Sequence, residues 1–257
     1  MSDYYMRDAA PIDAATWAQV DEMVVTVAKK VLVGRRLLNL VGPLGWGVEL
    51  APLFGFTVDD GADVVDDTAY IQLAELGQEF ILKAKQMLMA VQTPFGLDLG
   101  AVATAASRLC RAEDDLLIGG LLKKAGVSAE LGDWDTLGGP FKAVAEAIAK
   151  LQSEGVDGPY AAVMSPAMYA KLVSLMMHGR REVDMVGKLV EAGIFQSRSM
   201  PDDAVLIVSP QPWNTDMVVG QDIITSYLGN EGLDQRFRIF ETLVLRVKRD
   251  VAICALK

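Results

Sequence analysis

The side chains that could perform chemistry are few and form no recognisable catalytic pattern. His178 is the one histidine of the chain, so a site with several histidine ligands cannot form within one subunit. Cys110 and Cys254 lie among apolar residues, which is typical of buried thiols in a reducing compartment. Ser165 lacks the Gly-x-Ser-x-Gly pattern of a hydrolase and precedes a proline, so we expect it to cap a helix. These residues predict neither a nucleophile nor a metal site.

Three further clusters could bind cations or phosphate, and each has a simpler explanation. Glu113, Asp114 and Asp115 are neighbours in a helical pattern, where adjacent side chains point in different directions, so we expect salt bridges and solvation rather than a catalytic pair. The five aspartates within 59–67 lack the spacing of a calcium loop and predict a solvated loop. The glycine-rich run 42–47 follows a helix and lacks a Gly-Lys-Ser/Thr sequence, which favours a structural corner over a phosphate loop.

Amphipathic helices must position these residues. One tryptophan and four valines recur at steps of three and four, which predicts the buried stripe of a helix that begins after Asp13 and ends near Gly34. That stripe consists of Trp17, Val20, Val24, Val27 and Val31. A longer helix is predicted over 99–124 after a capping Asp98. Its inward face is expected to carry Val102, Ala105, Leu109, Ala112 and Leu116.

The remaining chain predicts a mixed architecture of the α+β class. Segment 48–93 has little helical periodicity, and a long irregular excursion of this kind is typical of an arm that embraces a neighbouring subunit. Further helices are predicted over 141–151, after Ser165, and over 182–192. Strands are predicted over 160–164, 204–208, 217–219, 223–227 and 237–247.

The composition indicates a protein that buries apolar surface between chains. The chain has 257 residues, of which 51% are hydrophobic, yet no apolar run reaches the roughly 18 residues of a membrane-spanning helix. The net charge of −10 argues against a partner that is nucleic acid. The N-terminal sequence lacks a basic region followed by an apolar segment, so we expect a cytoplasmic protein.

Several motifs in a fixed order resemble the shell proteins of encapsulin nanocompartments, the linocin-like branch in particular. They are Gly-Arg-Arg at 34–36, Gly-Pro-Leu-Gly-Trp at 42–46, the run 111–120, the run 155–160, Gly-Gln-Asp at 220–222 and the strand 237–248. The resemblance implies the HK97-type fold of phage major capsid proteins. It also implies five regions: an N-terminal helix and lead-in (1–47), an extended arm or E-loop (48–93), a peripheral domain with a spine helix (94–157), an axial domain (158–229) and a terminal strand returning to the peripheral domain (230–257).

The same resemblance implies a structural protein and not an enzyme. Copies of the chain, about 60, 180 or 240 of them, would form a closed icosahedral shell that packages no nucleic acid and contacts no membrane. The enclosed cargo would be an iron-storing ferritin-like protein or a peroxidase, captured by a short targeting tail at the cargo's own C-terminus. Two alternatives stay open at this point: a phage-derived capsid protein that packages DNA, and an oligomeric enzyme, such as a peptidase or bacteriocin.

Two sets of site residues follow from the resemblance. The groove for the cargo tail would be formed by Ala28, Leu32, Arg35 and Asn39; the alternative is that Arg35 bridges to an acid and Leu32 is core. The five-fold pore would be formed by Met177, His178, Gly179, Arg180 and Arg181; the alternative is that the arginines form salt bridges between subunits with Glu182 or Asp184. Some members hold a flavin on a tryptophan, but Lys85 stands at that position here, so no cofactor is expected.

Overall fold

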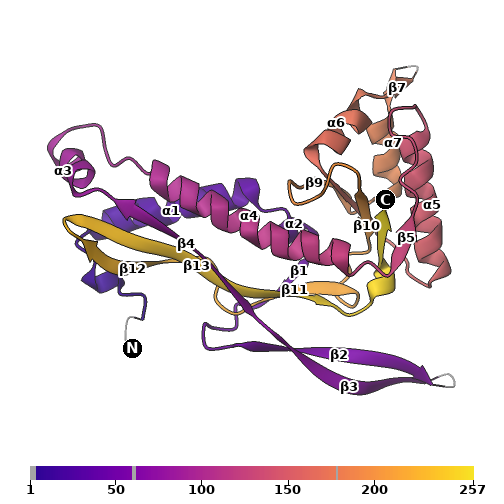
Figure 1. Cartoon of the computed structure of the whole chain (residues 1–257), viewed down its shortest axis with the longest axis horizontal. Coiled ribbons are helices and arrows are strands. Elements are labelled where there is room, and N and C mark those ends of the chain that lie inside the picture. The colour runs from indigo at the N-terminus through magenta and orange to yellow at the C-terminus, as the bar shows by residue number, and fades with distance from the viewer. Residues whose placement is uncertain (1–3, 60–61, 178) are drawn as a thin grey trace.

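The computed structural model describes residues 4–59, 62–177 and 179–257. It contains two five-stranded sheets (Figure 1). The first sheet has the order β1-β11-β13-β12, and β4 pairs with the other edge of β13. Its strands are β1 (Asn39–Val41), β4 (Ala74–Leu82), β11 (Thr215–Val219), β12 (Ile224–Glu231) and β13 (Asp234–Val247). The second sheet has the order β5-β14-β10-β6-β9. Its strands are β5 (Val127–Ala129), β6 (Ala161–Met164), β9 (Gly193–Gln196), β10 (Val205–Val208) and β14 (Ile253–Leu256).

Helix α1 (Ala14–Val31) begins and packs as its sequence predicts. The Asp13 carboxylate accepts a hydrogen bond from the Thr16 N–H at 2.8 Å, which caps the helix. Trp17, Val20 and Val24 are buried, and the indole ring meets the edge of Phe237 on β13 at 5.5 Å between ring centres. Val27 and Val31, the last two valines of the predicted stripe, are half-buried.

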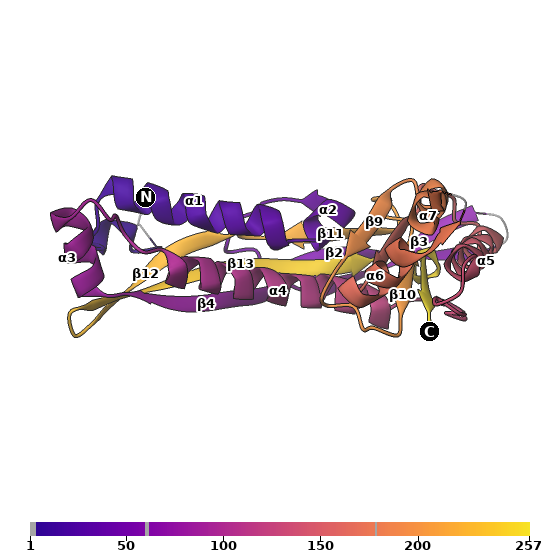
Figure 2. The ribbon, with the colours of Figure 1, turned by 90° about the horizontal axis from the view of Figure 1, so that it is seen from above.

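Helix α4 (Gly100–Lys123) is the spine of the subunit and runs beside α1 along the first sheet (Figures 1 and 2). Its N-cap is Leu99; Asp98, the predicted cap, lies one residue earlier and accepts a hydrogen bond from the Gly100 N–H at 2.9 Å. Val102, Ala105 and Leu109 are buried as predicted. The other two predicted inward residues, Ala112 and Leu116, are half-buried. The spine therefore joins the core of the first sheet to the second half of the molecule.

Three helices cover the second sheet: α5 (Gly139–Ser153), α6 (Pro166–Ser174) and α7 (Glu182–Leu189). Ser165 caps α6 as predicted, since its hydroxyl accepts a hydrogen bond from the Met168 N–H at 3.2 Å. A small hairpin of β7 (Met176–Met177) and β8 (Arg180–Arg181) connects α6 to α7 at the end of this unit (Figure 1). Short 3-10 turns occupy Arg7–Ala9 and Asp250–Ala252, and α7 ends three residues before the predicted limit.

A long hairpin projects away from both sheets (Figure 1). It consists of β2 (Leu50–Asp59) and β3 (Ala62–Gln72), paired antiparallel. The free hairpin is shorter than the predicted segment 48–93, because β4 joins the first sheet and is followed by helix α3 (Ala84–Gln92), which the sequence did not predict. The five strands predicted from residue 160 onward are confirmed as β6, β10, β11, β12 and β13, whereas β9 and β14 were not predicted. β11, β12 and β13 belong to the first sheet, and β6 and β10 to the second. The predicted domain limits stay predictions.

The glycine-rich run 42–47 forms a structural corner rather than a phosphate loop. Gly42 has φ of 124°, and a side chain at this residue would collide with the carbonyl oxygen of Val219. The N–H groups of Leu44 and Gly45 donate to the carbonyls of Val219 and Gly220. The corner thus fixes the chain between β1 and β2 against the end of β11. None of the helices in the described ranges is long and apolar enough to cross a membrane.

Candidate functional site

An apolar groove of about 520 Å³ lies between α1, the short helix α2 (Gly34–Leu37) and the loop before β12. Its lining consists of Val24, Val25, Ala28, Lys29, Leu32, Arg35, Arg36, Asp222 and Ile223. Ala28, Leu32 and Arg35, three of the four residues predicted for a cargo groove, are therefore brought together. Asn39 is exposed on β1 and does not line the groove.

Several lining residues were missed by sequence reasoning. Val25 and Lys29 lie one residue away from predicted positions on α1, and the 48% exposure of Val25 is unusual for a valine in a helix that packs on a core. The sequence signal that could have identified Val25 as a lining residue was a second apolar edge on α1. Asp222 and Ile223 come from a loop nearly two hundred residues away, and no local pattern connects that loop to α1.

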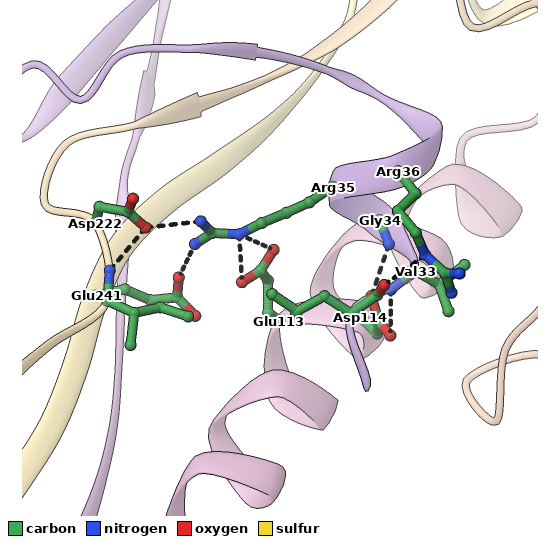
Figure 3. Close-up of polar contacts among 10 residues, drawn as sticks. Val33, Gly34, Arg35, Arg36, Glu113, Asp114, Asp222 and Glu241 are labelled. Atoms are coloured by element: carbon green, nitrogen blue, oxygen red, sulfur yellow. Dashed lines mark hydrogen bonds and ion pairs between the residues drawn. The ribbon is translucent and has the colours of Figure 1, made fainter. Parts of the chain in front are cut away.

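The floor of the groove is held by Arg35, whose three guanidinium nitrogens all bind carboxylates (Figure 3). Nε donates to both oxygens of Glu113 at 3.0 and 3.1 Å, Nη1 to Asp222 at 2.7 Å and Nη2 to Glu241 at 2.6 Å. These carboxylates come from α4, the loop before β12 and β13. Arg35 is therefore a positioning residue that joins four segments of the chain, which agrees with the alternative in which it bridges to acids.

The charges beneath the groove are balanced inside the subunit. Glu113 and Glu241 are fully buried, whereas the Asp222 side chain is half exposed. Burial, and secondly the neighbouring Glu113 carboxylate, raise the pKa of Glu241 to about 9. Glu241 consequently holds a proton near neutral pH and accepts from Arg35 without adding a second buried negative charge.

Asp114 fixes the start of α2. Its carboxylate accepts hydrogen bonds from the N–H groups of Val33 and Gly34 at 2.8 to 3.1 Å (Figure 3). Burial raises the pKa of Asp114 to about 6, and these hydrogen bonds act in the opposite direction. A side chain at Gly34 would collide with Leu117, so glycine lets α2 approach the spine closely.

The prediction that residues 113–115 are solvated is wrong for the first two. Glu113 and Asp114 are 0% and 5% exposed, and only Asp115 faces solvent. The predicted salt bridge is confirmed for Glu113, and the two side chains do point in different directions, one toward Arg35 and the other toward the backbone of α2. The two carboxylates can be buried because their hydrogen-bond donors, the Arg35 guanidinium and the N–H groups of Val33 and Gly34, lie at α2, about eighty residues earlier in the chain.

The predicted pore residues lie on the β7–β8 hairpin, at one end of the second unit (Figure 1). His178 and the side chain of Met177 lie outside the described residues, and Gly179 has φ of 78°. Arg180 and Arg181 are exposed, and Arg181 Nε lies 3.4 Å from Asp184 in the same subunit. Glu182 is buried and accepts hydrogen bonds from the N–H groups that begin α5, so Asp184 is the acid that the arginine reaches.

No group of three or more histidine, cysteine or acidic side chains in the described ranges could hold a metal ion. Both cysteines are buried as predicted, and burial raises the pKa of Cys110 to about 12 and that of Cys254 to about 11, which keeps both thiols protonated. Lys85 is exposed on α3, and the expectation concerning a flavin stays a prediction.

The fold itself belongs to the capsid class. A solved virus-like particle from Pyrococcus furiosus is similar with a TM-score of 0.83, at 22% identity over 94% of this chain and 99% of that chain. The mature capsid of bacteriophage PhiM1 is similar with a TM-score of 0.57, at 12% identity over 88% of this chain and 86% of that chain. The chain therefore has the predicted α+β, HK97-type fold of phage capsid proteins.

Sequence comparison narrows the class to one family. The family described as Linocin_M18, encapsulating protein for peroxidase, matches residues 2–244. The type 1 encapsulin shell protein EncA of Myxococcus xanthus is 33% identical over 279 aligned positions, which cover 100% of this chain and 97% of the relative. The chain belongs to this encapsulin family and is a structural shell protein that encapsulates cargo, not an enzyme.

Proposed function

We propose that this chain forms a closed icosahedral shell of about 60, 180 or 240 copies in the cytoplasm, and that the groove on α1 binds the targeting tail of its cargo. The single observation that carries the proposal is the apolar groove, which is open at the surface of the subunit. Arg35 and Asp222 of the ion cluster form part of its lining. A cavity with an apolar wall and a few polar groups at its edge is typical of a peptide-binding site.

The groove suits a short, apolar and extended tail. Val25 and Ala28 on α1 offer an apolar wall, and Lys29 and Arg36 add positive charge at the edge. Leu32, the residue after α1, also lines the groove but is only 5% exposed, which agrees with the alternative that it belongs to the core. Since the nitrogens of Arg35 already bind carboxylates, we assign the affinity for the tail to the apolar wall and not to that guanidinium. A weak single site is sufficient, because a multimeric cargo docks several tails onto one shell.

The cargo proposed here is a peroxidase or a ferritin-like iron-storage protein. The family description names peroxidase, and one relative is a fusion of a ferritin-like domain to an encapsulin shell domain, another a fusion with a diheme cytochrome. A capsid that packages DNA is disfavoured by the net charge of −10, because a surface that packs DNA needs clustered lysines and arginines. No flavin is part of this proposal.

The β7–β8 hairpin is the proposed lining of the five-fold pore. One loop repeated around a five-fold axis multiplies each charge by five, so Arg180 would favour the passage of small anions. Arg181 contributes less, because Asp184 offsets its charge. Replacing Arg180 with Ser is expected to slow the entry of small anions into loaded shells, and an unchanged rate for both anions and cations would remove this hairpin from the pore.

The groove is tested by placing one charge in its apolar wall. Val25→Asp is expected to give intact shells without cargo, because an apolar tail that covers the wall would strip water from the new carboxylate. Thr26→Asp is the matched control, since Thr26 is an exposed neighbour on α1 that does not line the groove. Co-expression with cargo, followed by purification of the particles, measures the cargo-to-shell ratio. Equal loading of the two variants would contradict the assignment.

A further inference from the structure

A second pocket, of about 420 Å³, lies where α1, α2 and α4 meet the start of α6 and the segment that follows β9. It is distinct from the groove, although Arg36 lines both. Four cationic side chains converge on it from separate parts of the chain: Lys30 at the end of α1, Arg36 on α2, Arg111 on α4 and Arg198 after β9.

None of these four cations forms an ion pair with a carboxylate of the described ranges. Of the four, Arg36 has a hydrogen bond within the described ranges, which its Nε donates to the carbonyl oxygen of Leu32 at 2.9 Å. Among the exposed arginines elsewhere, Arg181 and Arg236 each reach a carboxylate, whereas Arg108 and Arg180 stand singly without one in the part of the chain that the structure describes. In a chain with 34 acidic residues and 24 lysines and arginines, four cations without acidic partners at one pocket are a marked local excess of positive charge.

The only carboxylate in the lining does not cancel this excess. Asp114 is 5% exposed, and its oxygens bind the N–H groups of Val33 and Gly34 at the start of α2. Ser197, also in the lining, is buried and its hydroxyl oxygen accepts from the Ser199 N–H, which leaves its O–H free to donate. The lining therefore carries four cations against one carboxylate, and the oxygens of that carboxylate already accept backbone N–H groups.

We propose that this pocket binds a small anion that carries two or more phosphate groups. The planar guanidinium groups of Arg36, Arg111 and Arg198 match the geometry of phosphate oxygens, and the ammonium group of Lys30 adds a point charge. The space exceeds what one phosphate would fill, and the cations come from different elements, so a ligand with several phosphates contacts more of them at once. Binding also relieves the mutual repulsion of the four cations.

The test uses purified, cargo-free shells and therefore does not depend on the assignment of the cargo groove. Pyrophosphate is titrated into the shells by calorimetry at pH 7.5 and low ionic strength, with orthophosphate as the second ligand. We expect saturable binding of pyrophosphate at about one site per subunit, and weaker binding of orthophosphate. Arg111→Gln together with Arg198→Gln should weaken the affinity for pyrophosphate at least tenfold, because two charge-assisted hydrogen-bond donors are lost.

The matched control removes two positive charges elsewhere on the same helix. Lys123→Gln together with Lys124→Gln changes the net charge equally at the exposed end of α4, and we expect the affinity to stay within about twofold of the wild type. Absence of saturable binding to the wild type would overturn the proposal. Equal binding by the arginine variant and the wild type, or an equal loss in the lysine control, would overturn it as well.

Discussion

The β2–β3 hairpin exposes apolar side chains, whereas the Arg35 junction buries charged ones. The junction consists of Arg35 with Glu113, Asp222 and Glu241, and of Asp114 beside them. Leu50, Phe54 and Tyr70 on the hairpin are 54%, 45% and 66% exposed, and β2 and β3 form a sheet of two strands only. Such a hairpin is marginally stable alone. At the junction, by contrast, each buried carboxyl group accepts at least one hydrogen bond from the same chain, and Glu241 Oε1 is the one oxygen of Glu113, Asp114 and Glu241 without a partner among the described residues. The junction finds its partners in a single subunit, whereas we propose that the hairpin finds them on a neighbouring subunit.

Placing charges on the hairpin should have the largest effect. Leu50→Asp together with Tyr70→Asp is expected to abolish particle formation, because each subunit of a shell repeats the same contact and the loss of apolar burial recurs in every copy. Negative-stain microscopy and circular dichroism measure particles and helical content, and the helical content should remain. Leu50→Met with Tyr70→Phe keeps the surface apolar and should still assemble. Normal particles from the aspartate variant would show that the hairpin is dispensable.

Removing Arg35 should destabilise the subunit itself. Arg35→Met leaves the buried Glu113 carboxylate without its cation and Glu241 without its hydrogen-bond donor, and we expect a loss of about 3 to 5 kcal/mol in the free energy of unfolding. Urea denaturation followed by tryptophan fluorescence measures the loss. Arg108→Met is the control, since Arg108 is an exposed arginine of the spine helix α4, which also carries Glu113. If the two variants were equally stable, the junction would not hold the fold together.

The hydrogen bonds of Asp114 should have a smaller effect. Asp114→Asn replaces one acceptor with an amide donor that faces the N–H groups of Val33 and Gly34, so we expect a loss of about 2 kcal/mol. Asp115→Asn, on the exposed neighbour, should change the stability by less than about 0.5 kcal/mol. The same denaturation experiment compares them, and similar values for the two would contradict the role of Asp114 in α2.

The proton on Glu241 should make stability depend on pH. Folded Glu241 keeps its proton up to about pH 9, whereas the unfolded chain releases it near the ordinary value of 4.5. The unfolded state therefore binds fewer protons over this interval. The stability that protonated Glu241 contributes is fully present at low pH and is lost as the pH rises toward 9. The slope is at most about 1.4 kcal/mol per pH unit. Glu241→Gln should flatten the profile between pH 6 and 9, and an unchanged profile would refute the assignment.

Local patterns were sufficient for most elements and insufficient for the junction. The stripe on α1, the caps Asp13 and Ser165, and the strands of the C-terminal third follow from periodicity and capping chemistry, which act over a few residues. The burial of Glu113 and Asp114 depends on donors about eighty residues away, and residue types alone favour solvent for both. The same reason explains why Asp222 was missed in the groove, and why β4 was not separated from the arm.

The central claim is that this subunit, whose junction finds its partners within the chain and whose hairpin finds them on a neighbour, closes into a shell. Cryo-electron microscopy of the purified wild-type protein, expressed without cargo, tests it most directly. The account predicts hollow particles of uniform size with icosahedral symmetry, in which the β2–β3 hairpin of each subunit lies against a neighbour. Monomers or small open oligomers as the only species, or closed particles in which the hairpin contacts no other subunit, would contradict it.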